Sequence, residues 1–78
     1  MKNGDLNHEQ IKVLCQNIKA LRERTGLTKK EMAELLGIGV KSLTKIEQGI
    51  IPPKTGINII FQLAQNFKVP PRMLFEPL

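Results

Sequence analysis

Apolar residues recur along this chain every three or four positions, which is the spacing of one face of an α-helix rather than the alternation of a strand. The first such stripe consists of Ile11, Leu14, Cys15, Ile18 and Leu21. Gly26 comes after the stripe and can take the left-handed conformation that often ends a helix. The pattern therefore predicts a first helix over residues 8–25.

A second and a third helix follow, separated by a short turn. Thr28 and Glu31 form a capping box, in which each side chain binds the other residue's backbone N–H, so a helix is expected over residues 29–36. Its apolar positions are Met32, Ala33, Leu35 and Leu36. A glycine-bounded turn of three residues leads to a third helix, expected over residues 40–48 and ended by Gly49.

The C-terminal part of the chain predicts two further helices. A Pro-Pro pair after the third helix prevents it from continuing. A fourth helix is expected over residues 56–67, and a short fifth helix over residues 71–75. The core-facing positions expected in the fourth helix are Ile57, Ile60, Ala64 and Phe67. No segment calls for a strand, so the predicted class is all-α, with one domain over residues 7–78 after a polar tail, residues 1–6.

Length and charge narrow the range of functions. The 78 residues suffice for one small domain, and three Phe without Trp or Tyr suggest an aliphatic core. The formal net charge is +5, which favours an anionic partner, nucleic acid before a membrane surface. Many small basic proteins have no such partner, so charge alone does not decide.

Several classes of function lack the residues they need. One cysteine and one histidine cannot build a disulfide framework or a Cys/His metal cluster, and no carboxylate pair indicates catalysis, so we expect no enzyme, metal or cofactor. Cys15 lies in the apolar stripe and is expected in the core. No apolar run approaches the roughly 20 residues of a membrane span. A lone thiol fits the reducing cytoplasm, and no small-molecule ligand is indicated.

The third helix has two unlike faces when its residues are placed 100° apart. The inward half consists of Ser42, Leu43, Ile46 and Glu47. The outward half, which has no acid, consists of Val40, Lys41, Thr44, Lys45 and Gln48. Lysine can donate to guanine, threonine and glutamine can reach bases or phosphates, and valine can contact a thymine methyl. Taken alone, the same face is more often an ordinary solvated surface.

Additional lysines lie beside this segment. Lys29 and Lys30 open the second helix, where free backbone N–H groups also favour a phosphate, and Lys54 follows the third helix. Neutralising several phosphates in this way would make DNA binding strongly dependent on salt. With these lysines, the favoured interpretation of residues 27–49 is a helix-turn-helix whose second helix enters the DNA major groove.

Two charged residues fall at inward positions, where an unpaired charge is costly. They are Arg22, on the stripe of the first helix, and Glu47, on the inward edge of the third. We expect them to pair through two hydrogen bonds and so to fix the angle between the two helices. The alternative is that both side chains bend outward to water.

The motifs LTKKEMAELLGI and SLTKIEQG, in this order and spacing, resemble the Cro/phage-repressor (XRE) type of helix-turn-helix domain. The resemblance extends over about residues 14–75 and includes IKALR before these motifs. It implies a compact, five-helix, lambda-repressor-like bundle in which the third helix reads a palindromic or near-palindromic operator as a dimer.

The resemblance also assigns roles to individual positions. Val40, Lys41 and Lys45 match positions that reach bases in relatives, with Thr44 as a further candidate. Positions that contact the DNA backbone are matched by Lys29, Ser42 and Gln48. The Arg22–Glu47 pair matches an ion pair present in several members. The sequence departs from the family in its apolar helix start, Gly39-Val40, and in its apolar linker, Ile50-Ile51-Pro52-Pro53.

The favoured function is a sequence-specific DNA-binding transcriptional regulator, a repressor that binds a double-stranded operator as a homodimer. The expected dimer interface is an apolar patch comprising Ile59, Phe61, Leu63, Leu74 and Leu78. The alternative for this patch is an apolar surface with no partner. The alternative function is an antitoxin, or a protein-interaction module of a toxin–antitoxin pair, built on the same fold.

Overall fold

The computed structural model describes residues 8–51 and 56–77. Its elements are α1 (His8–Thr25), α2 (Lys29–Leu36), α3 (Val40–Glu47), α4 (Gly56–Phe67) and the short 3₁₀ helix η1 (Pro71–Phe75). No strand occurs in these two ranges, so the all-α class is confirmed. The expected tail, residues 1–6, and the side chains of Lys54 and Leu78 lie outside the described residues.

The expectation of five α-helices is wrong, because the last element is a 3₁₀ helix. The backbone N–H of Met73 donates to Pro70 O at 2.9 Å, and that of Glu76 donates to Met73 O at 3.3 Å. Both bonds span three residues, as in a 3₁₀ helix. Prolines flank this five-residue segment and lack the N–H groups that an α-helical ladder would use.

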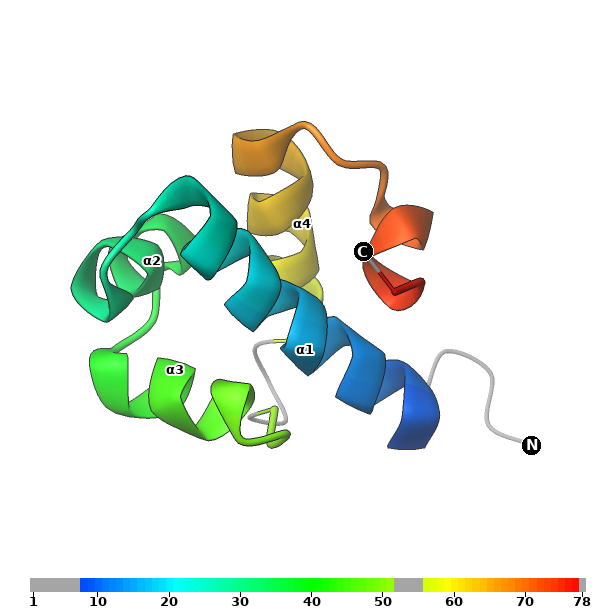
Figure 1. Ribbon diagram of the computed structural model, residues 1–78, viewed down its shortest axis with the longest axis horizontal. Coiled ribbons are helices and arrows are strands. Elements are labelled where there is room, and N and C mark those ends of the chain that lie inside the picture. Colours follow the sequence, from blue (N-terminus) through cyan, green and yellow to red (C-terminus); the bar gives the residue numbers. More distant parts are fainter. Residues whose placement is uncertain (1–7, 52–55, 78) are drawn as a thin grey trace.

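The five elements form a closed series of contacts in which α1 crosses the middle of the view in Figure 1. α1 contacts α3 on one side and η1 on another, while α2 packs against both α3 and α4. In Figure 1, α1 runs diagonally across the view, with α3 below it and α4 above it. α3 therefore lies at one edge of the bundle and has a free outer side.

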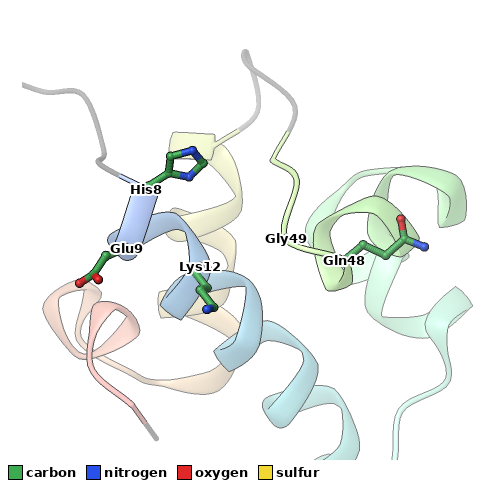
Figure 2. Close-up of a pocket in the computed structure, with 5 residues that line it drawn as sticks. All are labelled: His8, Glu9, Lys12, Gln48 and Gly49. Atoms are coloured by element: carbon green, nitrogen blue, oxygen red, sulfur yellow. The ribbon is translucent and has the colours of Figure 1, made fainter.

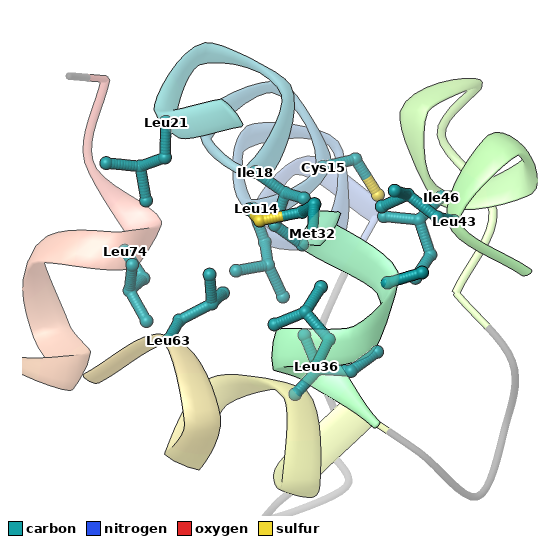
Figure 3. Close-up of a cluster of buried hydrophobic side chains, with 12 residues drawn as sticks. Leu14, Cys15, Ile18, Leu21, Met32, Leu36, Leu43, Ile46, Leu63 and Leu74 are labelled. Atoms are coloured by element: carbon teal, nitrogen blue, oxygen red, sulfur yellow. The ribbon is translucent and has the colours of Figure 1, made fainter. Parts of the chain in front are cut away.

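Side chains from all five elements form one apolar core (Figure 3). The buried apolar residues are Leu14, Cys15, Ile18, Leu21, Met32, Ala33, Leu36, Leu43, Ile46, Ile59, Leu63 and Leu74. Cys15 is among them, as expected, and burial raises the pKa of its thiol. A thiol that stays protonated is a poor nucleophile, so Cys15 acts as a small apolar residue.

α1, α2 and α3 end in the same way, at Gly26, Gly37 and Gly49, which have φ angles of 74°, 72° and 100°. In each case the residue after the glycine donates its N–H to a carbonyl five residues earlier: Leu27 to Arg22 at 3.1 Å, Ile38 to Ala33 at 3.0 Å and Ile50 to Lys45 at 3.0 Å. This is the Schellman arrangement. A Cβ at any of the three glycines would meet nothing within 4 Å, so the positive φ, not crowding, favours glycine there.

The core-facing side of α4 differs from the prediction. Ile57, expected in the core, is 86% exposed, whereas Ile59 is fully buried. Ile60 and Phe67 pack at the margin of the core. The buried side is rotated by roughly 100°, or one residue, from the predicted side. Because the apolar residues of α4 span an arc of roughly 200°, which is wider than the side covered by the core, periodicity alone cannot select which part of that arc faces inward.

Three of the five residues expected in the dimer interface are wrong for the same reason. Ile59, Leu63 and Leu74 are fully buried within one chain and cannot meet a partner. All three belong to the apolar core, and Figure 3 shows Leu63 of α4 beside Leu74 of η1. Of the five expected interface residues, Phe61 alone is described and exposed, at 56%.

A buried asparagine ties the C-terminal segment to α1. Asn17 is 3% exposed, and its Nδ2 donates to Leu74 O at 2.7 Å and to Glu76 O at 2.8 Å. Both carbonyls belong to η1 or the residue that follows it. Buried amides are stable when they are hydrogen-bonded, and this one anchors a short element that has few bonds of its own.

We expect Asn17→Leu to lower the free energy of unfolding by about 1–3 kcal/mol, because the Leu74 and Glu76 carbonyls would lose their donor. Chemical denaturation monitored by circular dichroism would measure this change. Gln16→Leu, at an exposed position of the same helix, is the matched control and should change stability by less than about 0.5 kcal/mol. Equal stability of the two variants would contradict an anchoring role for Asn17.

Candidate nucleic-acid interface

The N-terminus of α2 is fixed by its capping box. Glu31 N–H donates to Thr28 Oγ1 at 3.1 Å, and Thr28 N–H donates to Glu31 Oε1 at 2.9 Å. Lys29 and Lys30 occupy the first two positions of the helix and are exposed. The cap therefore holds two cationic side chains at a helix end whose dipole also favours negative charge.

The turn between α2 and α3 is short and locally bonded. Gly37 N–H donates to Glu34 O at 3.2 Å, in addition to the bond from Ile38 to Ala33. Gly39, in extended conformation, is the N-cap of α3 and provides no capping side chain. The backbone N–H groups at the start of α3 are thus left without a side-chain cap.

The inner side of α3 holds the helix against the bundle. Leu43 and Ile46 are fully buried and belong to the core, together with Cys15 of α1 and Met32 of α2. Figure 3 shows both side chains pointing from α3 toward the centre of the cluster. Two such anchors, three residues apart, determine which side of α3 faces outward.

Arg22 and Glu47, which the sequence pairs, are joined by two hydrogen bonds. Arg22 Nε lies 2.7 Å from Glu47 Oε2, and Arg22 Nη2 lies 3.2 Å from Glu47 Oε1. Their side chains are 17% and 6% exposed. Arg22 Nη1 also donates to Leu27 O at 3.4 Å, so one guanidinium links α1, the α1–α2 turn and α3.

The hydrogen bond from Arg22 to Glu47 raises the pKa of the guanidinium above its ordinary value. The guanidinium of arginine is charged at ordinary pH, and the bond to Glu47 reinforces its charged form. The geometry of the pair matters as much as its charge, because two parallel hydrogen bonds between the guanidinium and the carboxylate restrict the rotation of both side chains. This pair joins α1 to the inner edge of α3.

The outer side of α3 is free. Lys41, Lys45 and Gln48 are exposed, Val40 is 43% exposed and Thr44 is half-buried. In the described chain, none of these five side chains has a hydrogen bond to another residue. The structure therefore brings the expected base-reading positions onto one unobstructed surface. Ser42 differs, since it is half-buried beside the inner side.

A shallow notch of about 430 Å³ lies where the C-terminal end of α3 approaches the start of α1 (Figure 2). Its lining residues are His8, Glu9, Lys12, Gln48 and Gly49. The sequence did not single out Lys12, because no local signal shows that the start of α1 lies near the end of α3. Basic and acidic groups both line the notch, so its charge selects neither anions nor cations, and we assign no ligand to it.

Residues 15–76 match the family model described as a helix-turn-helix domain. The chain belongs to the helix-turn-helix domain family. The matched region contains α2, the turn, α3, and both partners of the Arg22–Glu47 pair. It follows that this is a DNA-binding helix-turn-helix domain, and the family is typically non-enzymatic. No curated protein and no solved structure matches the chain.

Two other properties bear on the function of this helix-turn-helix domain. Among residues 8–51 and 56–77, no helix combines the length and the apolar character needed to cross a bilayer. Within the same ranges, His, Cys, Asp and Glu side chains do not gather in groups of three or more that could hold a metal ion.

We expect Arg22→Ala to lower the free energy of unfolding by about 1–4 kcal/mol, because Glu47 would remain buried without a partner. Thermal and urea denaturation would measure the loss. Arg24→Ala removes an equal charge from an exposed position of the same helix turn and should change stability by less than about 0.5 kcal/mol. The double variant Arg22→Met with Glu47→Gln should recover part of the loss. If the Arg22→Ala and Arg24→Ala variants have the same melting temperature, the Arg22–Glu47 ion pair does not stabilise the fold.

Proposed function

We propose that this domain is a sequence-specific transcriptional repressor that binds a palindromic operator as a homodimer, with α3 in the major groove. The observation that carries the proposal is the unobstructed, acid-free outer side of α3. A helix fits the major groove, where each base pair presents a distinct pattern of donors and acceptors. Two copies related by a twofold axis would read two half-sites about one DNA turn apart.

The base-reading residues in this proposal are Val40, Lys41, Thr44 and Lys45. Both lysines donate to guanine O6 and N7, and Thr44 donates or accepts at a neighbouring base edge. The exposed part of Val40, at the start of α3, meets a thymine methyl. The preferred half-site therefore combines guanines with a thymine near one end.

The phosphate contacts in this proposal come from Lys29 and Lys30 at the start of α2 and from Gln48 at the end of α3. Ser42, which is half-buried, would reach a phosphate through its exposed edge, and Lys54 would add a contact after α3. These contacts position the domain but do not distinguish sequences. Occupation of the operator excludes other proteins from that DNA, which is why repression is the proposed outcome.

We expect Lys41→Ala with Lys45→Ala to reduce operator affinity to the level of random-sequence DNA, because both base-reading cations would be lost. The operator would first be selected from a pool of randomised oligonucleotides. Fluorescence anisotropy at one fixed salt concentration would then compare the selected site with a scrambled site.

The matched control for this variant is Lys68→Asn with Arg72→Ala. It removes the same charge from two exposed positions, one just after α4 and one in η1, and should retain the preference for the selected site. An unchanged ratio of operator to scrambled affinity in the Lys41/Lys45 variant would rule out the assigned base-reading side.

We expect Lys29→Ala to weaken binding to operator and scrambled DNA by the same factor, because a phosphate contact carries no sequence information. The slope of log affinity against log salt concentration should decrease in magnitude by about one. Titrations at four or more salt concentrations would measure the slope. A loss confined to the operator would instead place Lys29 at a base edge.

A further inference from the structure

α4 has an apolar outer face as well as an apolar inner face. Ile59 and Leu63 point into the core, while Ile57 and Phe61 are 86% and 56% exposed. These are the two most exposed large apolar side chains of the described chain. They lie four residues apart, so they are neighbours on one side of the helix. We call Ile57 and Phe61 the α4 outer face.

The helix that carries this face has no charge at all. Residues 55–67 form the longest uncharged run in the sequence, although the whole chain has a formal net charge of +5. α1, α2, α3 and η1 each carry lysine or arginine. The exposed polar residues of α4 are the amides Asn58, Gln65 and Asn66. An exposed apolar pair with an amide border and no charge is typical of a surface that another protein covers.

We propose that the α4 outer face docks a second copy of this chain. The inference rests on the homodimer of the proposed function and assigns an interface to it. Two copies with a charge of +5 repel each other, and a contact through α1, α2, α3 or η1 would have to match each buried lysine or arginine with an acidic residue of the partner. In a twofold pair the same patch meets itself, and α4 is the helix of the described chain whose patch brings no charge into that contact.

The size of the face sets the strength of the pair. A stable interface buries about 800 Å² on each partner, and two side chains supply a minority of that area. The dimer is therefore weak and depends on protein concentration. Adjacent half-sites on one operator would raise the local concentration of the second copy and complete the pairing on DNA.

The dependence on salt distinguishes a second copy from an acidic partner. Salt screens the repulsion between two basic chains and leaves the apolar contact in place, so self-association strengthens as salt rises. Binding to DNA weakens over the same range, because counterions are released. An oppositely charged protein on α4 would also bind more weakly as salt rises.

The test is sedimentation equilibrium of the full chain at several concentrations up to about 1 mM and at two salt concentrations. The wild-type protein should approach twice the 8.8 kDa mass of one chain, and more closely at the higher salt. Phe61→Glu and, separately, Ile57→Glu should weaken self-association by about tenfold or more. Both side chains are exposed, so the variants should keep the wild-type circular dichroism spectrum and melting temperature.

The matched control is Asn66→Glu, which adds the same charge to an exposed position of α4 about 140° around the helix from Phe61. It should dimerise as the wild type does. The proposal is overturned if the wild type stays monomeric at the highest concentration, or if Phe61→Glu and Asn66→Glu associate equally. Self-association that weakens with salt would also overturn it, as would a monomer that binds a different protein through α4.

DNA binding is scored separately. If the dimer forms through α4 but no selected oligonucleotide binds, the proposed function fails and the interface stands. If Phe61→Glu retains wild-type affinity for a single half-site and loses about tenfold or more on the paired site, both are supported. If Phe61→Glu binds the paired site with wild-type affinity, the α4 interface is overturned and the proposed function is not.

Discussion

The paired hydrogen bonds between Arg22 and Glu47 are the constraint on which the placement of α3 depends. Apolar contacts at Leu43 and Ile46 bring α3 against the bundle, but such contacts have no preferred direction and tolerate small rotations. A planar guanidinium that meets a carboxylate at two points does not tolerate them. Since Arg22 also binds the Leu27 carbonyl, the turn before α2 is held in the same frame.

α1 thus makes polar side-chain contacts with two other parts of the bundle. On one side Arg22 holds α3, and on the other Asn17 holds η1. Both attachments join residues distant in sequence, and both place a polar group among apolar side chains, where an unpaired group would be costly. The core alone would allow several ways to pack short helices, and these two side chains favour one of them.

Local signals explain what the sequence predicted well. A capping box marks the start of α2, Gly39 marks the start of α3, and glycines mark the ends of α1, α2 and α3, so these limits match to within one residue. The apolar arc of α4 is wider than the side that the core covers, so its orientation depends on tertiary packing, and the predicted core side and most of the predicted interface were wrong. The notch that includes Lys12 and Gln48 depends on an approach between distant segments, which no single-sequence pattern reveals.

The outer side of α3 makes no side-chain hydrogen bond within the described chain, whereas its inner side carries the anchors and Glu47. Val40, Lys41 and Lys45 can therefore be exchanged for other residues with little change in the free energy of unfolding. In the proposed DNA-reading role, a change of target sequence would not require compensating changes in the core. The side chains that would set DNA specificity and the side chains that stabilise the fold are therefore different ones on the same eight-residue helix. The first set can change among related chains without a change in the second.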